Sequence, residues 1–300
     1  MQRHFVSSRH YLAFITAMIA IGVACCTRAT NLTDSLTYDP QFGANRTNII
    51  YAEADHQKLY LDAHVPDGDG LHPIAIIVHG DGWMSGDRRH EISEMFEPLT
   101  RSNFTWFSIE YRLAPTNRWP ACFDDEETAV RWVKAHAKKY KGDPKRIALI
   151  GYSAGGHLVT FAGTHPEHGA RVNAIVGLAP PTDLVSDNVR RGGLTISMRS
   201  LFNFPNTNID DHARVILKKN SPLTYVQRGL PPFLIVQGDK DRTVPHTQSE
   251  AFQAALLAKN DACDFITITN AQHRIRDWDK FDPQWQGQVI TWMEQKMPPR

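Results

Sequence analysis

The sequence has no excess of charge of either sign, and it contains no linker, repeat or low-complexity segment. Its 33 basic and 32 acidic side chains leave a formal charge of +1, so we expect no basic surface for nucleic acid or an anionic membrane. The balance favours a neutral substrate. Because nothing divides the chain further, residues 30–300 are expected to form one domain.

Long apolar runs are missing as well. The longest, residues 11–24, holds 14 residues, whereas a membrane-spanning helix needs about 20. Arg3 and Arg9 precede this run, and small and polar residues follow it. This is the layout of a secretory signal peptide. We therefore expect residues 1–29 to be removed and the protein to be secreted or periplasmic, with no stable membrane partner; a membrane anchor is the alternative.

Cysteine is scarce. Cys25 and Cys26 fall within the predicted signal peptide, where a lipid attached to either one is a further alternative. Cys122 and Cys263 remain, and export would permit a disulfide between them. The sequence does not place these two residues close to each other.

Metal-ligand spacing is also absent. His79, His136 and His157 have no Asp or Cys at the intervals that metal sites use, so structural roles are expected for them. We expect no metal and no cofactor.

Strand-like and helix-like segments alternate from about residue 48 onward. Residues 74–78 (IAIIV) form a continuous apolar run, which is typical of a strand buried on both faces. The alternation predicts an α/β fold, a mostly parallel sheet with helices on both faces. Further strands are expected at 105–109, 146–150, 174–178, 233–236 and 265–269, with an antiparallel edge hairpin at 48–52 and 59–64. Helices are expected at 90–99, 124–139, 155–162, 248–259 and 284–297.

Residues 183–219 interrupt this alternation. Gly192, Gly193 and Pro205 occur among apolar residues that have no clean periodicity. The segment falls between two expected strands, where an insertion would lie over the edge of the sheet. It is therefore interpreted as a small cap insertion, or else as a long irregular helical crossover.

A nucleophile elbow is indicated where the strand 146–150 ends. There the sequence reads GYSAGG, and a helix is expected to follow. Gly-x-Ser-x-Gly between a buried strand and a helix presents a serine on a strained turn, and the glycines avoid β-carbons that would crowd it. The helix N-terminus favours developing negative charge. Ser153 is therefore the predicted nucleophile, with a glycine-rich helix cap as the inactive alternative.

Attack by this serine requires backbone N–H groups that stabilise an oxyanion. The N–H of Ala154, the residue after the nucleophile, is one expected donor. The loop after the strand 74–78 reads HGDGW, one residue away from the HGGG pattern of lipases and esterases, and Asp81 and Gly82 are expected to supply the other donors. Aspartate tolerates positive φ, so the loop geometry can survive. Trp83 and Tyr152 are the expected substrate contacts.

The acid and the base should follow the serine in the chain, in that order. Only His246 and His273 follow the strand 233–236. His273 lies just past the strand 265–269, where ligands bind in open α/β sheets, whereas His246 is expected on the solvent side of a helix start. Asp241, before a Val-Pro turn, is the predicted acid, and Asp239 is expected to hydrogen-bond within its loop.

Together these segments resemble the esterase families related to hormone-sensitive lipase and to the bacterial feruloyl and acetyl xylan esterases. The resemblance also includes YRLAP (111–115), GDP (142–144), PTDL (181–184), SP (221–222) and GDKDRTVP (238–245). It implies an eight-stranded α/β-hydrolase fold, a Ser153/Asp241/His273 triad and oxyanion donors near Asp81, Gly82 and Ala154. YRLAP would hold the loop beneath the oxyanion hole.

Hydrolysis of carboxylic esters is the activity that the resemblance implies. Export and a short acyl pocket beside Trp83 favour short-chain esters or cell-wall carbohydrate esters, so a small-molecule or carbohydrate ester is the expected partner. A serine peptidase of prolyl-oligopeptidase type, an aryl formamidase and a non-catalytic binding protein on the same fold are the alternatives.

Overall fold

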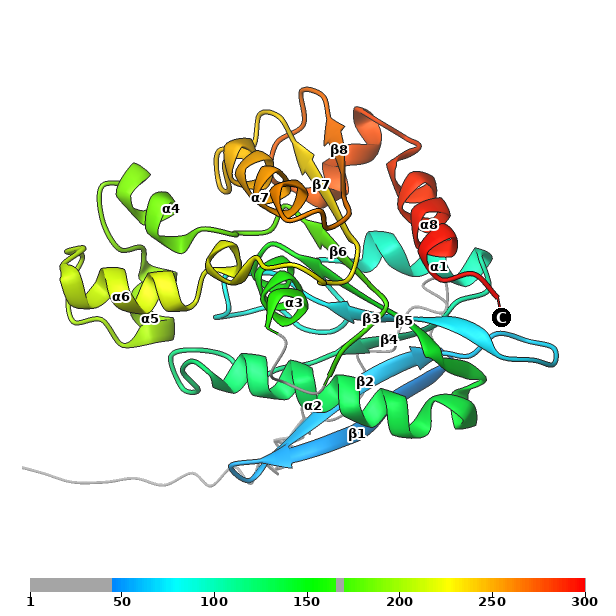
Figure 1. The fold of residues 1–300 in the computed structure, drawn as a ribbon. Coiled ribbons are helices and arrows are strands. Elements are labelled where there is room, and N and C mark those ends of the chain that lie inside the picture. Colours follow the sequence, from blue (N-terminus) through cyan, green and yellow to red (C-terminus); the bar gives the residue numbers. More distant parts are fainter. Residues whose placement is uncertain (1–44, 166–169, 300) are drawn as a thin grey trace, which may run out of the picture. The chain divides into compact units, whose positions relative to one another are not determined.

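An eight-stranded sheet in the order β1-β2-β4-β3-β5-β6-β7-β8 lies at the centre of the fold (Figure 1). β2 is antiparallel to β1 and to β4, and every other neighbouring pair is parallel. The mostly parallel eight-stranded sheet and its antiparallel edge hairpin are thus confirmed. The strands are β1 (Arg46–Ala54), β2 (Gln57–His64), β3 (His72–Val78), β4 (Thr105–Ile109), β5 (Gly142–Tyr152), β6 (Ala174–Leu178), β7 (Phe233–Gly238) and β8 (Cys263–Ile268).

The computed structural model describes residues 45–165 and 170–299. The predicted signal peptide, residues 1–29, lies outside this range. Within it, no helix is long and apolar enough to cross a membrane. Cys122 and Cys263 are both buried and free, so the disulfide that export would permit is not formed.

Helices cover both faces of the sheet and enclose two apolar cores (Figure 1). One core packs α2 (Ala121–His136), α3 (Ala154–Thr164) and α7 (His246–Ala258) on one face, and the other packs α1 (Phe96–Arg101) and α8 (Trp285–Lys296) on the opposite face. β4 and β6 are buried along their whole length, because helices cover them on both sides.

The largest differences between predicted and observed helix ends occur in two helices. The helix expected at 90–99 begins only with a 3-10 turn at Ser93–Met95, because Glu91 has a φ of 62°, which no helix accommodates. The helix expected at 124–139 starts earlier, at Ala121, and its last turn becomes 3-10 at Ala137–Tyr140. Such shifts are common where caps rather than apolar periodicity define a boundary.

The segment 183–219 contains three short helices, α4 (Leu184–Arg190), α5 (Ile196–Phe202) and α6 (Asp211–Lys219), which lie together at one side of the sheet (Figure 1). Each has a side-chain cap: Asp183, Thr195 and Asp210 accept hydrogen bonds from backbone N–H groups of the first turn. Helices of seven to nine residues are too short to show a clear apolar period, which explains the irregular pattern of the sequence.

Candidate active site

Ser153 lies on the sharp turn between β5 and α3. Its φ of 51° and ψ of −113° place a non-glycine residue in a strained region of backbone space. The turn is tight enough that a β-carbon at Gly151 would meet the Gly155 carbonyl oxygen at 2.2 Å, and one at Gly155 would meet the Val78 carbonyl oxygen at the same distance. Both glycines are therefore required by close backbone approach.

Three side chains from distant parts of the chain meet at this turn. His273 Nε2 lies 2.9 Å from Ser153 Oγ, and His273 Nδ1 lies 2.6 Å from Asp241 Oδ2. His273 follows β8, Asp241 follows β7 and Ser153 follows β5, so all three residues lie at the carboxyl ends of parallel strands of the sheet. The structure thus brings together the predicted nucleophile, base and acid in hydrogen-bonding order.

Asp241 is held by several donors at once. Its Oδ1 accepts the N–H groups of Thr243 at 2.8 Å and Val244 at 2.9 Å, and its Oδ2 accepts Gln237 Nε2 at 3.3 Å. The side chain has no exposed surface. These hydrogen bonds fix the orientation of the carboxylate, which in turn orients the imidazole of His273.

The predicted oxyanion loop has three consecutive residues with positive φ: Asp81 at 77°, Gly82 at 66° and Trp83 at 60°. Asp81 does not direct its carboxylate at the nucleophile; the carboxylate accepts a hydrogen bond from the Ser85 hydroxyl, and its carbonyl accepts the N–H groups of Met84 and Ser85. Ala154, opposite this loop, is the first residue of α3, where helix N–H groups have no intrahelical partner.

Tyr111 and His79 contact the backbone of this loop and each other. Tyr111 Oη donates to the carbonyls of His79 at 3.1 Å and Gly80 at 3.2 Å, and its ring stacks on His79. Burial lowers the pKa of His79 to about 4, so the imidazole is neutral, and its Nδ1–H can donate to the Gly80 carbonyl at 3.0 Å. These contacts give both residues the structural roles that were expected for His79 and for the YRLAP segment.

A cavity of about 280 Å³ opens beside the nucleophile. Ser153 and His273 line it, as do Asp81, Gly82, Trp83 and Tyr152, so the two expected substrate contacts do border this space. Tyr152 Oη donates to the His273 carbonyl at 2.9 Å, and burial raises the pKa of this phenol well above its usual range. Trp83 is 5% exposed.

Further residues that were not among the predicted site residues also line the cavity. The segment 183–219 contributes most of them, and no local pattern of the sequence signals their role. They are Glu91, Pro181, Leu184, Asp187, Arg191, Thr195, Ser197, Met198, Thr243 and Val244.

The two residues that were rejected for the triad make contacts that were not expected. His246 was expected on the solvent side of its helix, but its side chain is only 18% exposed, because the ring stacks on Phe265 and contacts Thr267 of β8. Asp239 was expected to bond within its own loop, and Lys240 Nζ donates to it there at 3.4 Å; it also accepts the N–H of Asn270, in the loop after β8. Asp239 thereby joins the two loops that carry Asp241 and His273.

A family model described as BD-FAE matches residues 61–256, about two thirds of the chain. Among characterised proteins, the chain is 32% identical over 241 residues to esterase LipC of Mycobacterium tuberculosis; the match covers 76% of this chain and 59% of LipC. The chain spans about half the length of the curated relatives that it matches.

Solved structures share the fold. A truncated carbohydrate esterase from gut microbiota superposes with a TM-score of 0.71 at 23% identity, covering 84% of this chain and 96% of its own. An acetyl ester-xyloside bifunctional hydrolase from Caldicellulosiruptor lactoaceticus superposes with a TM-score of 0.69 at 22% identity, covering 82% of this chain and 95% of its own. At this identity the likeness shows the α/β-hydrolase fold.

Proposed function

Because the chain belongs to the BD-FAE family, we propose that it is a serine carboxylesterase that hydrolyses short-chain acyl esters, such as acetyl or feruloyl groups on cell-wall carbohydrate. The hydrogen-bonded series from Ser153 through His273 to Asp241, open to a cavity, is the observation that carries this proposal. The relatives named as esterases support the reaction class, and the carbohydrate esterase and acetyl ester hydrolase of the same fold support the substrate class.

The geometry supports an acyl-enzyme mechanism. Ser153 Oγ attacks the ester carbonyl while His273 Nε2 takes the serine proton, and Asp241 stabilises the imidazolium that forms. The N–H groups of Ala154 and of the loop at Asp81 and Gly82 stabilise the oxyanion of the tetrahedral intermediate. His273 then protonates the departing alcohol, which leaves an acyl group on Ser153. Water next attacks this acyl group while His273 takes the water proton, and His273 returns the proton to Ser153 Oγ as the acid leaves.

Cavity size supports a short acyl group. The volume of about 280 Å³ lies just below the roughly 300–1,000 Å³ typical of ligand pockets. Each methylene of a longer chain gains about 0.8 kcal/mol only when it is buried against apolar surface. The segment 183–219 lines the cavity with Asp187, Arg191 and Thr195 as well as with Leu184 and Met198, so charged and polar groups interrupt the apolar surface that a long chain would need.

The first test is the nucleophile. Ser153→Ala should reduce hydrolysis of p-nitrophenyl acetate by about a million-fold, the effect of removing a triad nucleophile in related chemistry. Ser197→Ala, which removes another cavity serine, is the matched control and should retain most activity. If Ser153→Ala kept more than a few per cent of wild-type activity in a preparation free of contaminating esterase, the mechanism would be wrong.

The second test is acyl length. Across p-nitrophenyl esters from acetyl to decanoyl, kcat/KM should peak between acetyl and butyryl and fall beyond hexanoyl. Methyl ferulate and acetylated xylan extend the panel to carbohydrate-type esters. A maximum at octanoyl or longer would contradict the short-acyl proposal and favour a lipase.

Export also remains a proposal, supported by the charged start and apolar run of residues 1–29. The mass of the protein recovered outside the cytoplasm should correspond to a chain that starts near residue 30. Recovery of the full-length chain in the membrane fraction would favour an uncleaved anchor instead.

A further inference from the structure

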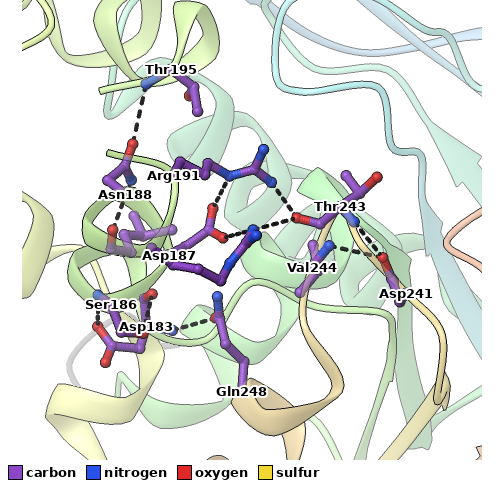
Figure 2. Close-up of polar contacts among 12 residues, drawn as sticks. Asp183, Ser186, Asp187, Asn188, Arg191, Thr195, Asp241, Thr243, Val244 and Gln248 are labelled. Atoms are coloured by element: carbon purple, nitrogen blue, oxygen red, sulfur yellow. Dashed lines mark hydrogen bonds and ion pairs between the residues drawn. The ribbon is translucent and has the colours of Figure 1, made fainter. Parts of the chain in front are cut away.

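A network of charged side chains connects the first helix of the cap to the loop that holds Asp241 (Figure 2). Arg191, at the end of α4, pairs through Nε with Asp187 Oδ2 at 2.8 Å and donates through Nη2 to the Thr243 carbonyl. Arg190 pairs with Asp187 Oδ1 at 2.7 Å, but its contact with the same carbonyl is long, at 3.4 Å. Of the two arginines, Arg191 therefore makes the closer contact with the acid loop.

Helix α4 is fixed at its other end as well. Gln248, in the first turn of α7, accepts the N–H groups of Thr182 and Asp183 through Oε1, both at 2.9 Å. The Thr182 hydroxyl donates to the Gln248 carbonyl at 3.0 Å. Gln248 is 5% exposed, so these are buried contacts. The start of α4 is thus anchored to the helix that follows the acid loop.

The turn after Arg191 is also held in place. Asn188, which is buried, donates to the Leu184 carbonyl and accepts the N–H of Thr195 through Oδ1 and the N–H of Gly193 through its own carbonyl. These bonds fix the chain on either side of the Gly192–Gly193 turn. Arg191 therefore projects from a helix whose two ends are both constrained.

One peptide group transmits the contact with Arg191 to the triad. The Thr243 carbonyl, which accepts from Arg191, and the Val244 N–H, which donates to Asp241 Oδ1 at 2.9 Å, belong to the same planar unit. Fixing the direction of the carbonyl fixes the direction of the N–H. A cation on the carbonyl also polarises the group and strengthens the N–H as a donor.

We propose that Arg191 is a positioning residue for the reaction: it holds the Thr243–Val244 peptide, which in turn holds the Asp241 carboxylate against His273. The inference rests on the proposed serine esterase mechanism and deepens it. The first helix of the cap then supports the triad in addition to bordering the substrate cavity. Arg191 does not touch the reacting atoms through this network, so its effect should appear in turnover.

The matched pair Arg191→Met and Arg190→Met tests this proposal. Both changes remove one positive charge and one ion pair with Asp187, but only Arg191→Met removes the close contact with the Thr243 carbonyl. With p-nitrophenyl acetate, Arg191→Met should lower kcat about tenfold with KM changed less than twofold, and Arg190→Met should lower kcat less than threefold. Equal losses in the two variants, or a loss confined to KM, would overturn the proposal.

A double-mutant cycle separates positioning from a general effect on the fold. If Arg191 acts through Asp241, Arg191→Met should cause no further loss of kcat in an Asp241→Ala background, because the effects of residues in one network are not additive. A tenfold loss that persists in that background would contradict the proposal. Thermal melting of each variant should change little, because the arginine is 30% exposed.

Asp187→Asn provides a second variant that keeps both arginines. The amide is a weaker acceptor for Arg191 Nε than the carboxylate, so kcat should fall about threefold. As for Arg191→Met, this loss should be absent in the Asp241→Ala background. An unchanged kcat in the wild-type background would contradict the network. Ser153→Ala, measured in the same series, tests the esterase mechanism itself: if it stays active, the proposed function fails, whatever the arginine variants show.

Discussion

Asp241, on the loop after β7, and Glu126, in the middle of α2, are both buried carboxylates with opposite surroundings. Asp241 accepts hydrogen bonds from two backbone N–H groups and an amide and contacts His273. Glu126 is fully buried, and neither of its oxygens has a hydrogen-bond partner among the described residues. Its neighbour Asp125, by contrast, accepts three hydrogen bonds from the Arg112 side chain.

The difference lies in the hydrogen-bond donors around each buried carboxylate, and not in depth alone. Without donors, burial raises the pKa of Glu126 to about 8, so this side chain is mostly protonated at neutral pH. Around Asp241 the N–H groups are fixed by the turn that follows, so they hold the carboxylate against the imidazole of His273. Glu126 has no such contacts, and it costs stability when it ionises.

The largest effect should come from removing the base that Asp241 holds. His273→Ala should lower kcat for p-nitrophenyl acetate by about a million-fold, as removal of the base does in related triads. His246→Ala is the matched control and should stay largely active, since His246 packs on β8 away from the nucleophile. The reverse ranking would place the base on the loop after β7.

Isosteric amides at the two carboxylates test the comparison directly. Asp241→Asn should lower kcat about ten-thousand-fold, because an amide favours the wrong imidazole tautomer. Glu126→Gln should leave kcat within twofold of wild type. Steady-state kinetics on both purified variants provide the measurement, and a large loss from Glu126→Gln would connect α2 with the chemistry.

For the pH dependence of the free energy of unfolding, in contrast to kcat, Glu126 is the carboxyl group whose replacement should matter. Glu126 has a raised folded-state pKa, so the folded protein binds an extra proton between its ordinary value of 4.5 and about 8. The contribution of the protonated Glu126 side chain to the free energy of unfolding is therefore fully present below pH 4.5 and is lost as the pH rises through about 8. The gain in free energy of unfolding of Glu126→Gln over wild type should therefore be larger at pH 8.5 than at pH 5, by on the order of a few kcal/mol.

Urea unfolding of wild type and Glu126→Gln at pH 5 and 8.5 measures this difference. Glu127→Gln provides a neighbouring control, because Glu127 pairs with Arg131. A stability difference between wild type and Glu126→Gln that did not grow with pH would mean that Glu126 finds a partner in solution.

The smallest effect concerns an exposed carboxylate, that of Asp81. Because this side chain accepts a hydrogen bond from Ser85 and the residue has a φ of 77°, we expect it to order the proposed oxyanion loop. Asp81→Asn keeps an acceptor and tolerates positive φ, so it should retain most of kcat, whereas Asp81→Gly should lose kcat several-fold. Higher kcat for Asp81→Gly would show that the charge opposes the oxyanion instead.

Local signals made most of the fold and the core of the site predictable. Residues 74–78 and 233–236 read correctly as strands because apolar runs of this length fit a sheet buried on both faces. Ser153 could be recognised as the candidate nucleophile from the glycines around it. Only glycine fits at Gly151 and Gly155, because a β-carbon at either position would lie 2.2 Å from a backbone carbonyl oxygen. No comparable sequence pattern indicated the positive φ of Glu91, so the helix predicted to begin at residue 90 begins later in the structure.

The sequence by itself determined the strands and the elbow, because each depends on residues close together in the chain. The candidate nucleophile, acid and base can be read in order along the chain, but their meeting depends on the tertiary structure, because His273 and Ser153 are 120 residues apart. Only the tertiary structure decided that Arg191 reaches the Thr243 carbonyl, 52 residues away, and that Glu126, among consecutive acidic residues of α2, is the one whose oxygens have no hydrogen-bond partner among the described residues. These features depend on how separate elements pack, and side-chain charge in a sequence does not indicate which donor it will meet.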